Sequence, residues 1–123
     1  MTGGATEDRF RPSARRSYGK AVRKVRNRRV ERFIKILRQR LPELKERYRV
    51  ASLGLFGSYV RNQQTPRSDL DILVEFAEAP HIFGFMDLEK HLAKLLGVRV
   101  ELVSRKALKG NIGDRILREV VSV

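Results

Sequence analysis

The segment 57–71, GSYVRNQQTPRSDLD, combines residue types that could hold a phosphate and a metal ion. Gly57 has no side chain, so backbone there can approach a ligand closely. Ser58 is predicted to open a short helix that runs to Asn62, where free N–H groups and the helix dipole favour a phosphate. Arg61 follows one turn later, and its guanidinium could grip phosphate oxygens at two points.

Three carboxylates complete this candidate site. Asp69 and Asp71 are two residues apart on a predicted strand, so their side chains emerge on the same face. Hard oxygen ligands at that spacing suit magnesium, and metal ions held by carboxylates can activate an attacking oxygen and stabilise leaving pyrophosphate. Glu101, on the matching face of another predicted strand, is either a third metal ligand or the general base. Each residue alone would be ordinary surface or turn; their combination predicts nucleotidyl transfer from a magnesium-bound nucleoside triphosphate.

Alternating and helical periodicities predict the elements that must position these residues. In 69–76 the apolar side chains alternate with Asp69, Asp71, Leu73 and Glu75. Pro42 is expected to divide the first helical region, Gly97 to end a helix, and Asn111 to cap the last one. Strands are thus predicted over 50–56, 69–76 and 98–103, and helices over 30–41, 42–48, 85–96 and from 111 onward.

This order of elements predicts an α/β (α+β) fold, with a small mixed sheet of about three or four strands and helices on one face. The other face is expected to be open and to present Asp69, Asp71 and Glu101. Three acids gathered there would repel one another, so the arrangement calls for a cation.

Length and composition narrow the class of protein. The chain has 123 residues and no cysteine, which allows one small domain and excludes disulfides and thiolate metal sites. No apolar run is long enough to span a bilayer, so we expect no membrane contact and a cytoplasmic location.

The net charge of +13 lies almost entirely in residues 1–50, which hold 17 Lys and Arg against 5 Asp and Glu. We expect residues 1–29 to be a basic, disordered extension and 30–123 to be the folded domain. A basic arm of this kind could contact RNA or another polyanion through residues 9–49. It could equally be a solvated tail.

The motif resembles that of the minimal nucleotidyltransferases of the DNA polymerase beta superfamily, which have Gly-Ser, about ten residues, and then Asp-x-Asp. Segments 53–56, 95–97 and 114–119 also resemble sequences of this family, as does Ser68 before the first Asp. The resemblance implies a polymerase beta-like fold. It implies that Gly57 and Ser58, with Ser68 beside them, bind the triphosphate, and that the two aspartates bind metal.

Among these proteins the chain is most similar to the MntA-like antitoxins of HEPN/MNT toxin–antitoxin modules. This resemblance implies an enzyme that uses ATP and Mg²⁺ to adenylylate a tyrosine of a HEPN ribonuclease toxin. Two residues depart from the family pattern: Glu101 stands where the third carboxylate is usually Asp, and Asn62 where Gly often follows the arginine.

Two other functions remain open from the sequence. The chain could be an antitoxin that neutralises its toxin by binding alone, which the change to Glu101 would favour. It could also be a nucleotidyltransferase-like protein that binds nucleic acid, which the basic arm would favour.

Overall fold

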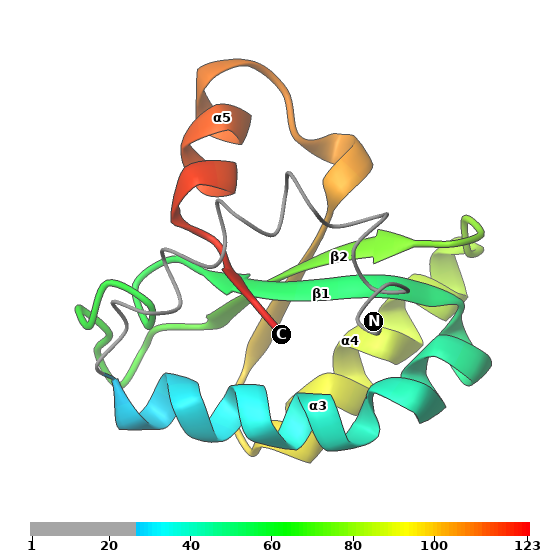
Figure 1. Cartoon of the computed structure of the whole chain (residues 1–123), viewed down its shortest axis with the longest axis horizontal. Helices are drawn as coiled ribbons and strands as arrows, with labels where there is room; N and C mark the ends of the chain where they lie inside the picture. The colour runs from blue at the N-terminus through cyan, green and yellow to red at the C-terminus, as the bar shows by residue number, and fades with distance from the viewer. Residues whose placement is uncertain (1–26) are drawn as a thin grey trace, which may run out of the picture.

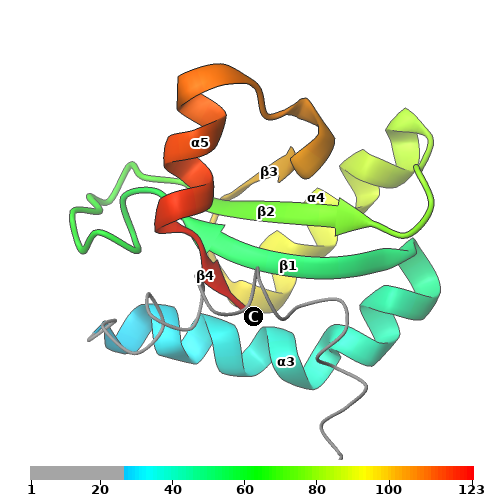
Figure 2. The ribbon, with the colours of Figure 1, turned by 45° about the horizontal axis from the view of Figure 1, so that its top comes forward.

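The computed structural model describes residues 27–123, and their centre is one four-stranded sheet in the order β3-β2-β1-β4 (Figure 2). β1 pairs antiparallel with β2 on one side and with β4 on the other, whereas β2 and β3 are parallel. The predicted fold class, with a small mixed sheet, is therefore confirmed. The strands are β1 (Val50–Phe56), β2 (Leu70–Phe76), β3 (Val100–Ser104) and β4 (Val121–Ser122).

Two long helices cover one face of this sheet, and a shorter helix stands over part of the other (Figure 1). The long helices are α3 (Arg28–Tyr48) and α4 (Ile82–Leu96), and the third is α5 (Gly110–Glu119), preceded by a 3-10 turn over Arg105–Ala107. The main core lies beneath α3 and α4, where Leu37, Ile72 and Leu92 are fully buried. A second cluster around Phe56, Leu73 and Val120 lies on the side of α5. Helices therefore cover parts of both faces, whereas the sequence predicted helices on one face only.

Pro42 does not divide the first helix, which is a correction to the sequence-based prediction. α3 runs without a break from Arg28 to Tyr48, with Pro42 inside it. Proline removes one backbone donor, but Pro42 is exposed, so water can reach the carbonyl that loses its partner. Leu37 and Leu44, on either side of the proline, are both fully buried. Packing against the sheet thus holds the two halves in one helix.

The remaining boundaries differ in smaller ways. The segment after β1 is a succession of turns over 57–62 and not a helix. α4 begins at Ile82, three residues before the predicted start, and ends at Gly97 as expected. α5 is capped at Lys109 without a side-chain hydrogen bond, so Asn111 lies inside the helix and does not cap it.

The predicted disorder over 1–29 lies outside the described residues except at 27–29, where the structure instead shows Asn27 capping α3 and the helix beginning at Arg28. Within 27–123, no helix has the length and apolar character needed to cross a membrane.

Asn27 joins the start of α3 to the turns that follow β1. Its side-chain oxygen accepts hydrogen bonds from the N–H groups of Arg29 and Val30, at 3.1 and 3.3 Å. Its amide nitrogen donates to the carbonyl oxygen of Tyr59 at 2.6 Å. The residue is therefore both a helix cap and a long-range tether.

Replacing Asn27 by Ala should lower the free energy of unfolding by about 2 kcal/mol, because a helix cap and a buried hydrogen bond are lost together. Chemical denaturation measures the change. Asn111→Ala is the matched control, because Asn111 is exposed and caps nothing; it should change stability by less than about 0.5 kcal/mol. Equal effects of the two substitutions would contradict the role of Asn27.

Candidate active site

Gly57 begins the turn after β1 and touches the carboxylate of Asp71. Its φ of +87° lies in the left-handed region that favours glycine. A Cβ atom at this position would lie 2.0 Å from Oδ2 of Asp71. The turn is closed by hydrogen bonds from the N–H of Arg61 to the Gly57 carbonyl, at 3.1 Å, and from Gln63 to Ser58, at 2.8 Å. Only glycine therefore allows the backbone to lie against this carboxylate.

Strand register brings these residues together. Phe56 is the antiparallel partner of Asp71, so the chain leaves β1 directly beside that residue. Asp71 is in turn the parallel partner of Glu101 on β3. The sequence had placed Glu101 on the matching face of another strand; the structure shows that this strand is the direct neighbour of β2, and the motif turn lies at the same end of the sheet. α5 covers Leu73 farther along this face but leaves Asp71 half-buried and Glu101 exposed.

The Asp71 carboxyl has a clearly perturbed pKa. The pKa of Asp71 is raised from 3.8 to about 6, and burial is the largest cause. Repulsion from Glu101, a hydrogen bond that the protonated Asp71 carboxyl donates to Glu101, and repulsion from Asp69 act in the same direction, while Arg61 lowers the pKa. A concentration of negative charge at this point favours a nearby cation.

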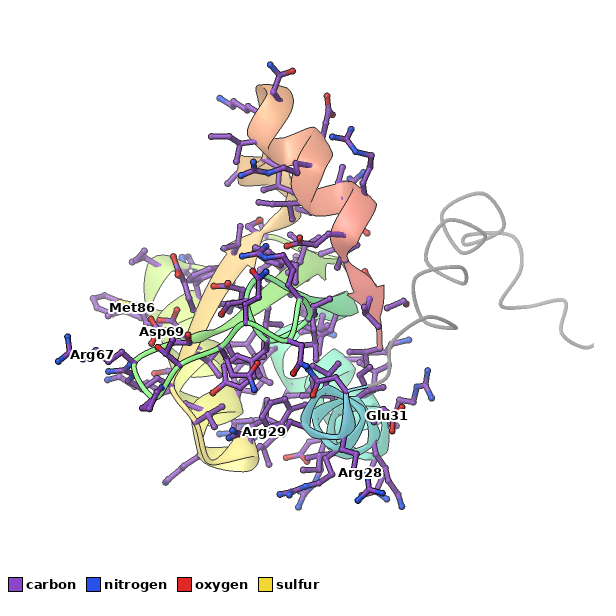
Figure 3. All side chains as sticks on the ribbon, turned by 90° about the vertical axis from the view of Figure 1, so that its left-hand side faces the viewer. Arg28, Arg29, Glu31, Arg67, Asp69 and Met86 are labelled. Carbon is purple, nitrogen blue, oxygen red and sulfur yellow. The ribbon has the colours of Figure 1, made fainter. Side chains whose placement is uncertain are left out.

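Asp69 lies at the edge of the group and is paired elsewhere. Its Oδ1 atom is 3.0 Å from Nε of Arg99, and its side chain is largely exposed. Figure 3 looks onto this end of the molecule and shows Asp69 beside Arg67, with Arg29 at the start of α3 beneath them. Arg99 also donates to the carbonyl oxygen of Arg67, which ties the loop before β2 to the start of β3.

The carboxylates suit a divalent cation, although their present arrangement is not a finished metal site. Across residues 27–123, no three acidic or histidine side chains are gathered closely enough to hold a metal ion. Asp71 and Glu101 are the adjacent pair, and their oxygens are the ligand type that magnesium prefers. Oδ1 of Asp69 is paired with Arg99, so Oδ2 is the oxygen that Asp69 could offer to a cation.

The two serines predicted to bind nucleotide lie in different surroundings. Ser58 is half-buried in the motif turn next to Gly57. The hydroxyl of Ser68 instead accepts a hydrogen bond from the N–H of Thr65 at 2.9 Å and shapes the loop 65–68. The structure therefore places Ser58, but not Ser68, in the motif turn.

Sequence reasoning gave no role to Glu119, which reaches the motif turn from the end of α5. Its Oε2 atom accepts a hydrogen bond from the N–H of Gly57 at 2.7 Å. Nη1 of Arg61 lies 3.0 Å from each of its carboxylate oxygens. In the sequence, Glu119 is marked only as the last residue of segment 114–119, which resembles the family. That resemblance does not reveal a contact with a residue 62 positions away.

The same turn is anchored from the opposite side by Tyr59. The Tyr59 ring is 5% exposed and packs edge-on against Phe33 of α3, with ring centroids 5.7 Å apart. The guanidinium of Arg29 lies over this ring at 5.5 Å. Helices α3 and α5 therefore hold the turn between them.

Comparisons with known proteins agree with this geometry. The nucleotidyltransferase domain family matches residues 30–122. The protein adenylyltransferase MntA of Thermococcus cleftensis is 47% identical over 94 residues, which cover 76% of this chain and 95% of that protein.

Solved structures give the same result at the level of the fold. A candidate minimal nucleotidyltransferase superposes with a TM-score of 0.62 at 32% identity, covering 73% of this chain and 92% of the other. A mutant of a toxin–antitoxin complex that contains MntA superposes with a TM-score of 0.51 at 26% identity, covering 76% of this chain and 69% of the other. The chain belongs to the nucleotidyltransferase domain family, and within it to the protein adenylyltransferases related to MntA.

Proposed function

We propose that this enzyme transfers AMP from magnesium-bound ATP to a hydroxyl group of a partner protein. The observation that carries the proposal is the contact of the Gly57 turn with Asp71, which in turn lies beside Glu101. A turn suited to phosphates and a cluster of acids suited to a cation meet at one end of the sheet. Nucleotidyl transfer requires both at the reacting phosphorus.

In the proposed reaction, the acceptor oxygen forms a bond to the α-phosphorus while the bond from that phosphorus to the bridging oxygen breaks. Pyrophosphate leaves, and the acceptor proton passes to a carboxylate, for which Asp71 or Glu101 is placed. The pKa of Asp71, raised to about 6, belongs to the metal-free site, and a cation bound there would favour the ionised carboxylate. Ser58 and Arg61 would hold phosphate oxygens of the nucleotide.

Magnesium would be held by Asp71 and Glu101, with Asp69 as a third ligand, and would neutralise charge on the phosphates. The chain's own contribution is to keep these carboxylates in register and close to the motif turn. Glu101 is exposed and one methylene longer than Asp, which gives it the reach to act either as ligand or as base.

We further propose that the acceptor is a HEPN-type toxin and that the chain acts as its antitoxin in the cytoplasm. The support is the relationship to MntA and the likeness to a structure described as a toxin–antitoxin complex. We assign the catalytic domain to residues 27–123, because Asn27 caps α3 and α3 begins at Arg28, and regard 1–26 as a basic extension.

Labelled ATP tests the reaction directly. Incubation of the enzyme with the toxin and α-labelled ATP should transfer label to the toxin, whereas γ-labelled ATP should leave it unlabelled. Chelation of the divalent cation should stop the transfer. Label retained only from the γ position would indicate a kinase and exclude adenylylation.

A second candidate is an antitoxin that neutralises by binding alone. The observations that favour it are the ion pair of Asp69 with Arg99 and the absence, among residues 27–123, of three acidic or histidine side chains close enough to hold a metal ion. Replacing both Asp69 and Asp71 by Asn separates the hypotheses. Loss of toxin neutralisation supports catalysis, whereas full neutralisation by the double variant supports simple binding.

A contact with RNA or another polyanion is supported by the exposed face of α3. Five exposed basic residues lie in its first three turns: Arg28, Arg29, Arg32, Lys35 and Arg38. Affinity for single-stranded RNA should fall steeply as salt rises, because binding releases counterions. An affinity indifferent to salt would exclude this contact.

A further inference from the structure

The carboxylate of Glu119 accepts hydrogen bonds from two groups of the proposed nucleotide site. It accepts from the N–H of Gly57 at 2.7 Å and from Nη1 of Arg61 at 3.0 Å, with its side chain 22% exposed. Hydrogen bonds between charged partners are stronger than neutral ones, and partial burial limits their competition with water. The last residue of α5 is thus joined to the first residue of the motif turn.

The backbone on both sides of this contact is firmly placed. Directly after Glu119, Val120 and Val121 are buried, and β4 pairs with β1 at Gly54 and Leu55. A Cβ atom at Gly54 would lie 2.5 Å from Cγ2 of Val120, which shows how closely the two segments approach. Glu119 is therefore fixed relative to β1, and hence to the turn that β1 leads into.

The contact also fixes the orientation of Arg61. Nη1 is held by Glu119, and Nε donates to the side chain of Gln63 at 3.2 Å. Within residues 27–123, Nη2 makes no hydrogen bond, so this nitrogen is the part of the guanidinium left for a ligand. An arginine that is already oriented loses less side-chain entropy when it binds a phosphate.

We propose that Glu119 is a positioning residue of the nucleotide site, which acts by holding Arg61 and the Gly57 turn ready for the phosphates. This inference rests on the proposed function. It also changes which groups can donate hydrogen bonds to the phosphates. The N–H of Gly57 is engaged by Glu119, so phosphate contacts fall to Ser58 and to Nη2 of Arg61. The opposite role, an internal anion that competes with phosphate for Arg61, predicts the opposite change in ATP affinity.

The test compares Glu119→Gln, Arg61→Gln and the double variant by steady-state adenylylation of the toxin. Glu119→Gln should raise KM for ATP about tenfold and change kcat less than about threefold, as expected when a phosphate contact common to ground and transition states weakens. In the Arg61→Gln background, the same substitution should raise KM less than about twofold, because its effect passes through Arg61. Glu43→Gln is the matched control, since Glu43 pairs with Arg40 on the exposed surface of α3; it should leave KM unchanged.

Thermal unfolding of each variant identifies any change in the kinetic constants that comes from misfolding. Fully additive effects of the two substitutions, or a KM that is unchanged or lowered by Glu119→Gln, would overturn the inference.

Amide hydrogen exchange gives a readout independent of ATP: the N–H of Gly57 should exchange faster in Glu119→Gln than in the unmodified chain. If the proposed function fails, the unmodified chain transfers no label although this difference persists. If only the inference fails, transfer by the unmodified chain is intact and the exchange rates or the KM values do not respond as stated.

Discussion

Replacing Asp71 by Asn should abolish transfer and, at the same time, make the metal-free protein more stable above pH 6. The loss of activity should be about a thousandfold or more, because the carboxylate lies at the centre of the proposed site and can act as metal ligand or base. The gain in stability should be about 1 kcal/mol after allowance for the solvent that still reaches this side chain. A substitution that removes function while strengthening the fold is typical of a residue kept for chemistry.

The sign follows from the direction of the pKa change. The pKa of Asp71 rises from 3.8 to about 6 on folding, so the folded state disfavours the ionised carboxylate. Its cost to stability is absent below about pH 4 and complete above about pH 6. The difference in stability between Asp71→Asn and the unmodified chain should therefore shrink as the pH falls from 6 to 4.

Urea unfolding at pH 8, 6 and 4, without divalent cation, measures this difference. The matched control is Asp87→Asn, because Asp87 is exposed on α4 and far along the chain from the motif turn. It should change neither activity nor the dependence of stability on pH. Added magnesium should stabilise the unmodified chain but not Asp71→Asn. A variant that is less stable at pH 8 than at pH 4, relative to the unmodified chain, would contradict the account of Asp71.

Replacing Gly57 by Ala is expected to have the second large effect. The new Cβ would overlap Oδ2 of Asp71 in a backbone conformation with φ of +87°, so either the turn or the carboxylate must move. We expect stability to fall by about 2–4 kcal/mol and transfer to fall by about a hundredfold or more, since small displacements of reacting groups are costly in rate.

Gly97→Ala is the control that isolates the contact. Gly97 has a similar φ of +72°, but a Cβ atom there would meet nothing within 4 Å. Its substitution should cost about 1 kcal/mol in backbone strain and leave transfer unchanged. Thermal or chemical unfolding, together with label transfer, compares the two variants. Equal loss of stability in both would mean that closeness to Asp71 is not what requires glycine at position 57.

The sequence alone determined the features that depend on neighbouring residues. Alternation along 70–76 gave a strand with its carboxylates on one face, and Gly97 ended a helix in the left-handed conformation. The spacing of Gly57, Ser58, Asp69 and Asp71 pointed to nucleotidyl transfer, because local geometry already limits where such side chains can lie. A local rule failed at Pro42, where packing of Leu37 and Leu44 outweighs the helix-breaking tendency of proline.

Only the tertiary structure decided which distant groups touch. The contact of Gly57 with Asp71 follows from the antiparallel register of β1 and β2, and the pairing of Asp71 with Glu101 from the parallel register of β2 and β3. A shift of one residue in either register would turn these side chains to opposite faces, so no local pattern could specify the contact. Asp69 with Arg99, and Glu119 with Arg61, likewise meet only because strand pairing and the packing of α5 bring their segments together. The local sequence thus identifies the residue types that could do chemistry. Their contact partners, and the pKa of a carboxyl such as that of Asp71, depend on packing between segments far apart in the chain.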